Sequence, residues 1–203
     1  MVKLSIAVCV YNQEELILRA LQSIPEREDI EVVIVNDGST DRTDDIIKSW
    51  REWQHKFAIN YIYYPENRGI GYARNEALKA STGEWFGTLD SDDYFYTYDY
   101  EKVIAQLDDR YDIVYHNLVN NEGTVYYLSD ITNRIWCAFT TKCVKKSLFE
   151  GLEFKEEHKF AEDLYMNEDL LKKNPKKLYT NITAYHYNWP REGSICWQQS
   201  NKE

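Results

Sequence analysis

The first 93 residues repeat one pattern, a short apolar run followed by an amphipathic segment, and this repeat constrains the fold more than any other feature. Each run has the length of a strand and is almost continuously apolar, as strands buried on both faces of a parallel sheet are. The runs are Leu4–Val10, Glu31–Val35, Asn60–Tyr64 and Trp85–Leu89. Three strand-then-helix units leading into a fourth strand predict an α/β fold with a doubly wound parallel sheet.

Polar clusters stand where the predicted strands end. They are Tyr11–Asn12, Asn36–Thr40, Asn67–Gly71 and Asp90–Asp93. Ligands of doubly wound sheets bind at the carboxyl ends of the strands, so these clusters predict where the binding site lies. Asn12, with Glu15 three residues further on, is also expected to cap the first helix.

The chain beyond residue 93 has a looser pattern. Helical patterns cover 102–107 and 161–173, and strand patterns cover 112–119, 124–128 and 178–189. Asn120–Gly123 has the composition of a hairpin turn between two of these strands. Because no internal repeat and no flexible linker interrupts the chain, we expect one domain, residues 1–203, whose smaller C-terminal part extends the same sheet.

The composition argues against nucleic-acid binding and against a membrane-spanning protein. The 203 residues carry 34 acidic and 24 basic side chains, a net charge of -10, so the basic surface that binds nucleic-acid phosphates is missing. No run of about 18 apolar residues occurs, so we expect no transmembrane segment and at most peripheral membrane contact. The four cysteines form no C-x-x-C pair, which favours a reducing, cytoplasmic compartment.

The acidic loop Asp90-Ser91-Asp92-Asp93 is the strongest candidate for metal binding. In an extended segment Asp90 and Asp92 project to the same side, and carboxylate oxygens are suitable ligands for a divalent ion. The alternative to metal binding is a structural role, because carboxylates are also favoured in solvated turns and at the start of helices.

Five segments together resemble the family-2 glycosyltransferases. They are Ser5–Asn12, Val33–Asp41, Asn67–Asn75, Asp90–Asp93 and Ala161–Tyr165, and they occur in the family's order. The resemblance covers most of the chain and implies a Rossmann-like GT-A fold, a single α/β domain whose mostly parallel central sheet is flanked by helices. It also implies that residues 1–100 form the nucleotide-sugar donor half, and residues 101–203 the acceptor half and a closing segment.

The resemblance implies which residues contact the donor. Tyr11, Asn12 and Asp37 match the positions that hold the nucleotide base, commonly uracil. The other residues that match the donor site are Gly38, Asn67, Gly69, Arg74, Asn75, Asp90 and Ser91. The alternatives are that Asp37 and Gly38 form an ordinary turn and that Arg74 pairs with a surface acid.

The resemblance also implies catalytic and metal-binding roles. Asp163 matches the base that deprotonates the acceptor hydroxyl, and Glu162 would help to position it. The alternative for both residues is that they only stabilise the start of the helix, where the helix dipole favours acids whatever the function. Asp92 and Asp90 match the metal ligands, and His186 could complete the metal shell, although a lone His is more often structural.

The segment 185–194 resembles the part of the family that closes over the donor phosphates. Arg191 and Ser194 match its later positions, whereas Asn188 departs from the Arg that many relatives have there.

These matches predict a metal-dependent, inverting glycosyltransferase. It would use Mn²⁺ or Mg²⁺ and move a sugar from a nucleotide-sugar, a UDP-sugar by expectation, to a hydroxyl of a carbohydrate or glycoconjugate acceptor. A sugar nucleotidyltransferase would need a glycine-rich basic loop after the first strand, where this chain has Tyr11–Glu15. A sugar-nucleotide-binding or scaffolding protein without catalysis is the other alternative, and the retained Asp92 and Asp163 argue against it.

Overall fold

The four predicted strands form the parallel part of one sheet. The computed structural model describes residues 1–129, 138–157 and 162–191. In it β1 (Leu4–Val10) lies between β2 (Ile30–Asp37) and β4 (Trp85–Thr88), β3 (Ala58–Tyr64) lies beside β2, and all three pairs are parallel. The connecting helices are α1 (Ile17–Gln22), α2 (Thr43–Arg51) and α3 (Ile70–Ala80).

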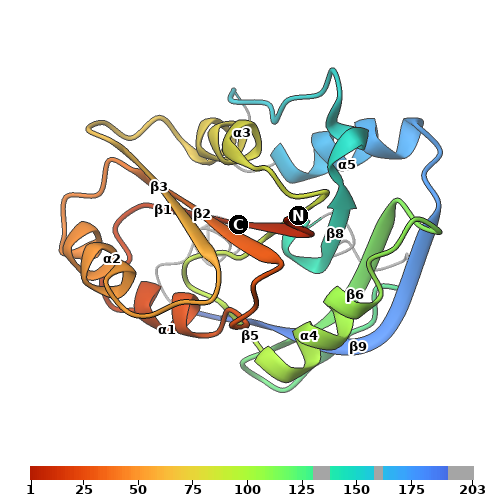
Figure 1. Cartoon of the computed structure of the whole chain (residues 1–203), viewed down its shortest axis with the longest axis horizontal. Helices are drawn as coiled ribbons and strands as arrows, with labels where there is room; N and C mark the ends of the chain where they lie inside the picture. The colour runs from red at the N-terminus through yellow and green to blue at the C-terminus, as the bar shows by residue number, and fades with distance from the viewer. Residues whose placement is uncertain (130–137, 158–161, 192–203) are drawn as a thin grey trace, which may run out of the picture.

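The later strands continue the same sheet, as the sequence predicts, but they make it mixed. β8 (Lys142–Lys145) pairs antiparallel with both β4 and β6 (Ile113–Asn120), and β6 runs parallel to β9 (Lys177–Tyr187). β5 (Tyr94–Phe95) pairs antiparallel with β9, and β7 (Val125–Tyr126) forms the predicted hairpin with β6. The order is β3-β2-β1-β4-β8-β6-β9-β5, and β9 curves around one end of the molecule (Figure 1).

Helices cover both faces of the sheet (Figure 1). α1, α2 and α4 (Thr97–Ala105) lie on one side, and α3 and α5 (Glu162–Lys172) lie on the other. Two short 3-10 helices, η2 (Phe139–Thr141) and η3 (Lys146–Phe149), flank β8. Within the described part of the chain, no helix is both long enough and apolar enough to span a bilayer.

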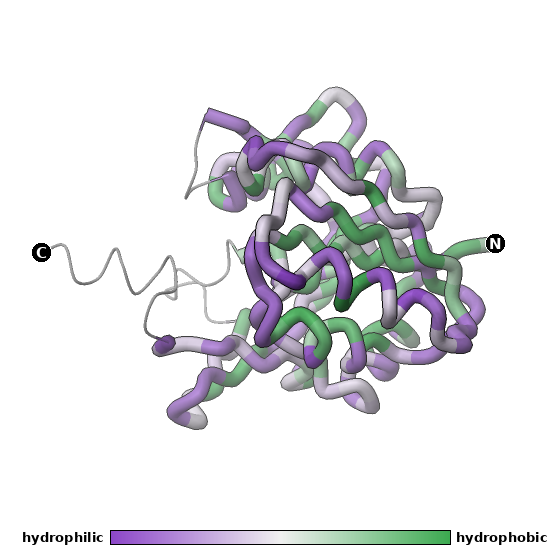
Figure 2. Tube along the Cα trace, turned by 90° about the vertical axis from the view of Figure 1, so that its left-hand side faces the viewer, coloured by the Kyte–Doolittle hydropathy of each residue, from purple (hydrophilic) through white to green (hydrophobic). Residues whose placement is uncertain are grey.

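Each face of the sheet carries its own hydrophobic core. Leu4, Ile6 and Val8 of β1 pack in the cluster that includes residues of α1, α2 and α4. Ala7, between them in sequence, packs in the other cluster with Met166 of α5. Because successive strand side chains point to opposite faces, a strand covered on both sides must be apolar at nearly every position. Figure 2 shows these hydrophobic segments gathered in the interior.

The start of α1 differs from the prediction. Leu16 precedes the helix without a side-chain cap, and Asn12 does not reach it. The Asn12 Oδ1 instead accepts the backbone N–H of Thr40 at 2.8 Å, and Asn12 has a positive φ of 51°. The predicted cap is therefore wrong, because the Asn12 side chain joins the ends of β1 and β2.

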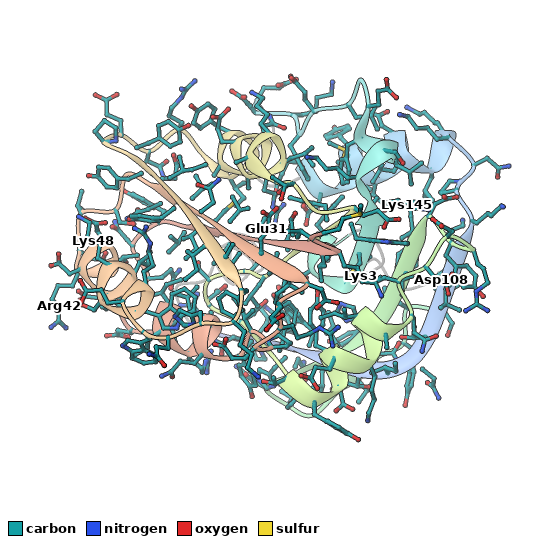
Figure 3. All side chains as sticks on the ribbon, viewed as in Figure 1. Lys3, Glu31, Arg42, Lys48, Asp108 and Lys145 are labelled. Atoms are coloured by element: carbon teal, nitrogen blue, oxygen red, sulfur yellow. The ribbon has the colours of Figure 1, made fainter. Side chains whose placement is uncertain are left out.

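A buried acid holds the opposite, amino-terminal edge of the sheet together. Glu31 lies at the start of β2, near the centre of the view in Figure 3, whereas charged side chains such as Arg42 lie at the periphery. Glu31 is 7% exposed, and its carboxylate accepts hydrogen bonds from Ser5 Oγ at 2.5 Å and Thr82 Oγ1 at 2.7 Å. Burial alone would raise the pKa of Glu31, but these bonds and backbone N–H groups outweigh it and hold the pKa below its usual value.

Candidate active site

The polar clusters predicted from the strand ends meet at one edge of the sheet. Hydrogen bonds join the end of β1 to the loop after β2, and the end of β2 to the start of α3. Side chains of α3, of the loop after β4 and of α5 meet nearby. The structure therefore brings the predicted clusters together at the carboxyl ends of the strands, where doubly wound sheets bind their ligands.

Asp37 connects β2 to the start of α3. The residue is 3% exposed, and its carboxylate accepts the backbone N–H groups of Arg68 at 3.0 Å and Gly69 at 2.7 Å. Asn67 donates its side-chain amide to the Asp37 carbonyl at 3.1 Å. Gly38 has φ +76°, and a Cβ there would lie 2.5 Å from the Asn67 nitrogen, so this close approach requires glycine.

Tyr11 and Asn12 extend the same edge at the end of β1. The Asn12 N–H donates to Ser39 Oγ at 3.0 Å, which fixes the turn after the strand. The Tyr11 side chain is 46% exposed and free to contact a planar ligand. The three residues predicted to hold the base, Tyr11, Asn12 and Asp37, thus lie in connected segments.

Arg74 lies at the centre of a buried charge cluster. Its side chain is 4% exposed, and its guanidinium contacts the carboxylates of Glu162 and Asp163 and lies 3.3 Å from Asp90. Arg74 is itself buried, and its acids come from two segments distant in sequence, so Arg74 does not form the surface ion pair of the alternative. Burial would lower the pKa of Arg74, but Asp163, Glu162 and Asp90 together raise it, so the cation is retained.

The acid pair at the start of α5 is divided into a buried and a more accessible member. The Glu162 side chain is 9% exposed and that of Asp163 is 22% exposed. Burial, reinforced by Asp163 and Asp90 and opposed by Arg74, raises the pKa of Glu162 to about 7. Asp163 accepts Arg74 on Oδ1 and the Phe139 backbone N–H on Oδ2 at 3.1 Å. Both oxygens of Asp163 are therefore oriented by the protein.

The acidic loop is a tight turn rather than the extended segment that we expected. The Asp93 N–H donates to the Asp90 carbonyl at 3.1 Å, which closes the turn. Asp90 and Asp92 keep partly exposed side chains, 38% and 25%, whereas Ser91 is 7% exposed. Burial and the neighbouring Asp92 and Asp163, opposed by Arg74, raise the pKa of Asp90 to about 6.

The closing segment reaches the acidic loop through Arg191. Its Nη2 donates to Asp92 Oδ2 at 2.6 Å. His186 has both ring nitrogens engaged, Nδ1 with Tyr96 Oη at 3.1 Å and Nε2 with Asn121 Oδ1 at 2.9 Å. The structure therefore gives His186 a packing role and does not support it as a metal ligand. Ser194 lies outside the described residues.

Asn75 serves the fold in this structure. It is 3% exposed, and its amide donates to the Phe154 carbonyl at 2.9 Å and accepts the Phe154 N–H at 2.7 Å. This pair of bonds fastens the segment before α5 to α3. A donor contact through Asn75 stays a prediction that this geometry does not favour.

Sequence reasoning assigned no structural role to Asp93 and Tyr185, two residues that hold the acidic loop in place. Asp93, 1% exposed, accepts the Tyr185 hydroxyl at 2.6 Å, and Tyr185 is fully buried on β9. Burial and then the charges of Asp92 and Asp90 raise the pKa of Asp93. Both residues lie in segments that the sequence singled out, the acidic loop and 185–194, but their contact joins positions 92 residues apart and has no local sequence signal.

The sequence pattern described as "Glycosyl transferase family 2" matches residues 5–161, well over half of the chain. The chain belongs to glycosyl transferase family 2. Among curated family members, glycosyltransferase GlyA of Streptococcus pneumoniae is 30% identical over 95% of this chain and 31% of its own length. Poly(ribitol-phosphate) beta-N-acetylglucosaminyltransferase TarS of Staphylococcus aureus is 30% identical over 95% of this chain and 36% of its own length. The chain therefore spans about a third of these relatives.

Solved structures confirm the family fold. S. aureus TarS 1–349 in complex with UDP-GlcNAc has a TM-score of 0.79 and 27% identity, over 95% of this chain and 60% of that chain. The mannosyltransferase PcManGT from Pyrobaculum calidifontis, in complex with GDP-Man and Mn²⁺, has a TM-score of 0.77 and 22% identity, over 97% of this chain and 59% of that chain. The likeness to TarS shows that the predicted single α/β GT-A fold is correct, with a curled central sheet.

The acidic loop fits a metal that the donor helps to hold. Among the residues that the structure describes, no group of three or more His, Cys, Asp or Glu side chains forms a complete metal site. Mg²⁺ is commonly bound through one or two carboxylates together with substrate phosphates, and Mn²⁺ favours similar oxygen ligands. Asp92 and Asp90, partly exposed at the same edge, can supply such a pair.

Proposed function

We propose that this chain transfers a sugar from a nucleotide-sugar, by preference a UDP-sugar, to a hydroxyl of a carbohydrate or glycoconjugate acceptor. The main support for the proposal is that three features lie at one edge of the sheet. They are the strand ends predicted to hold the base, the acidic loop, and the acid pair of α5 that contacts Arg74. Family membership and the UDP-GlcNAc complex of the similar TarS support a nucleotide-sugar donor.

The base of the donor would lie at the ends of β1 and β2. The exposed Tyr11 ring can stack on a planar base, while Asn12 is held in place by its bonds to the loop after β2. Asp37 accepts two backbone N–H groups, and a carboxylate offers about four acceptor positions, so it can also accept a base N–H. Asn67 and Gly69, bonded to Asp37, border the path from the base to the phosphates.

Asp163 would act as the base of a single displacement. Arg74 and the Phe139 N–H orient its carboxylate and leave lone pairs for the acceptor hydroxyl. As the acceptor oxygen attacks the anomeric carbon, Asp163 takes its proton and the nucleoside diphosphate leaves from the opposite face, with inversion. Glu162, more deeply buried on the same guanidinium, would position Arg74 rather than exchange protons with the acceptor.

The leaving diphosphate would be neutralised at the acidic loop. Mn²⁺ or Mg²⁺ held by Asp92 and Asp90 would supply Lewis-acid stabilisation of its growing charge. Arg191 has donors for the same group, because its Nε is buried and finds no acceptor within the described residues. In this arrangement Arg191 exchanges Asp92 for a phosphate oxygen when the donor binds. Residues 1–100 would then form the donor half, and Asp163 and Arg191 would come from the acceptor half.

A donor panel tests this function. The purified protein is incubated with UDP-, GDP- and TDP-sugars and Mn²⁺, and release of the nucleoside diphosphate and the melting temperature are measured. A ligand specific for the native state adds about 2.7 kcal/mol at 100 times its dissociation constant, so UDP with Mn²⁺ should raise the melting temperature and EDTA should reverse most of the rise. No shift and no release with any donor would reject the proposal, and a larger effect of GDP would change the assigned base.

A further inference from the structure

The third acid of the loop, Asp93, is buried, whereas Asp90 and Asp92 are partly exposed. Its two oxygens accept the Tyr185 hydroxyl at 2.6 Å and the Asn188 backbone N–H at 2.8 Å. The Tyr185 oxygen in turn accepts the Asp90 backbone N–H at 3.2 Å. Hydrogen bonds of Asp93 and Tyr185 therefore tie both ends of the acidic loop to the end of β9.

Tyr185 is held independently of these hydrogen bonds. Its side chain is fully buried, and its ring lies edge-on against Phe95 at 5.6 Å between centroids. The two residues are also register partners between β5 and β9. Because packing and pairing fix the ring, the Tyr185 hydroxyl is a stationary point to which the loop is attached.

The same bonds determine where Arg191 can reach. Asp93 is the next residue after Asp92, and it anchors Asn188, three residues before Arg191. Arg191 bridges back to Asp92 at 2.6 Å. The buried Asp93 carboxylate thus fixes two parts of the site. It holds the neighbouring Asp92, the candidate metal ligand, and it holds Asn188, from which the chain continues to Arg191.

We propose that Asp93 and Tyr185 are positioning residues that hold Asp92 and Arg191 at the spacing needed to bind one diphosphate together with its metal. The inference rests on the proposed function, because it assigns Asp92 and Arg191 to the same ligand. Residues behind the direct ligands of a metal commonly change metal affinity about 10-fold or more when they are replaced. A ligand displaced by a fraction of an ångström loses its productive geometry, although the fold survives.

Tyr185→Phe is the sharpest test, because it removes one hydroxyl and keeps the ring. We expect the dissociation constant of UDP with Mn²⁺, measured by calorimetric titration, to rise about tenfold. Uridine lacks the diphosphate and should bind both proteins equally, since, among the described residues, its proposed contacts Tyr11 and Asp37 make no hydrogen bond to Asp93 or Tyr185. Asp93→Asn should act in the same direction, because the neutral amide is a weaker acceptor for the Tyr185 hydroxyl.

Tyr100→Phe is the matched control. Tyr100 is 1% exposed in the same core cluster, stacks on the same Phe95 at 3.7 Å, and has its hydroxyl 3.5 Å from Cys143 Sγ. The Tyr100→Phe protein should lose some thermal stability and keep its affinity for UDP with Mn²⁺. Melting curves establish that all variants are folded at the titration temperature.

The outcomes separate the inference from the proposed function. If the unsubstituted protein does not bind UDP with Mn²⁺, both fail. If it binds, and Tyr185→Phe binds as tightly as Tyr100→Phe does, the positioning role alone is wrong. Equal weakening of uridine and of UDP with Mn²⁺ would also reject it, because that pattern indicates general loosening. In an Arg191→Ala background the effect of Tyr185→Phe should shrink, and full additivity of the two changes would contradict a path through Arg191.

Discussion

Replacing Arg74 by Gln should destabilise the protein strongly, and more at high pH than at low pH. The substitution removes a buried cation and leaves Glu162, Asp163 and Asp90 without their common ion-pair partner. Breaking a buried ion pair by removing one partner costs about 3 to 5 kcal/mol. The Glu162 side chain is 9% exposed, but those of Asp163 and Asp90 are 22% and 38% exposed and are screened by water, so we expect about 3 kcal/mol at pH 8.

The pH dependence follows from Glu162. Its pKa is raised from 4.5 to about 7 in the folded protein, so its contribution to stability is present below pH 4.5 and is lost as the pH rises through 7. Without Arg74 the opposing charge is gone and the folded-state pKa moves further upward. The variant should therefore lose more stability between pH 5 and pH 8 than the unsubstituted protein does.

Urea unfolding at pH 5 and pH 8 measures this difference. A deficit of about 3 kcal/mol lowers the midpoint by roughly 1 to 2 M urea. Arg27→Gln is the control, because Arg27 pairs with Asp29 at 2.7 Å with side chains 33% and 36% exposed, and such pairs contribute about 1 kcal/mol or less. Two results would refute the reasoning. One is a loss of unfolding free energy for Arg74→Gln at pH 8 that is as small as that of the control, and the other is a loss that is larger at pH 5 than at pH 8.

Three further predictions concern the site and its support. Gly38→Ala should lower the melting temperature clearly more than Gly69→Ala, because both have positive φ but only a Gly38 Cβ meets backbone, at 2.5 Å; equal losses would contradict this. Glu31→Gln should reduce stability by about 1 to 3 kcal/mol in urea unfolding, because its buried bonds weaken, and leave UDP binding unchanged, because Glu31 lies at the opposite edge. Asp92→Asn should weaken binding of UDP with Mn²⁺ and slow turnover, and an unchanged Mn²⁺ dependence would place the metal elsewhere.

The parallel part of the fold was predictable because its signal is local. β1, β2 and β4 are buried at nearly every successive position, which only a sheet covered on both faces accommodates, whereas the edge strand β3 alternates between exposed and partly buried residues. The antiparallel insertion of β8 between β4 and β6 has no such signal. It depends on Trp85 pairing with Lys145, which lies 60 positions later in the chain. The predicted mostly parallel sheet is therefore parallel only from β3 to β4 and between β6 and β9.

The composition of the site was more predictable than the pairing inside it. Strand ends converge in any doubly wound sheet, so Asp37 and the acidic loop could be assigned to one edge from the sequence. The contact of Arg74 with Asp163 joins residues 89 positions apart and depends on how α5 packs. The predicted helix cap at Asn12 was wrong for a related reason. The capping rule considers only neighbouring residues, whereas the Asn12 side chain accepts a hydrogen bond from Thr40, which is distant in sequence.

The transfer rate of Asp163→Asn, with UDP affinity measured on the same protein, tests the central claim most directly. Asn keeps the size of the side chain but cannot take the proton, so transfer should slow by about 100-fold or more while UDP with Mn²⁺ binds nearly as before. Its amide can still accept one of the bonds from Arg74 and Phe139, and a melting curve establishes that the variant is folded at the assay temperature. Retention of more than about a tenth of the original rate would contradict the assignment of Asp163 as the base.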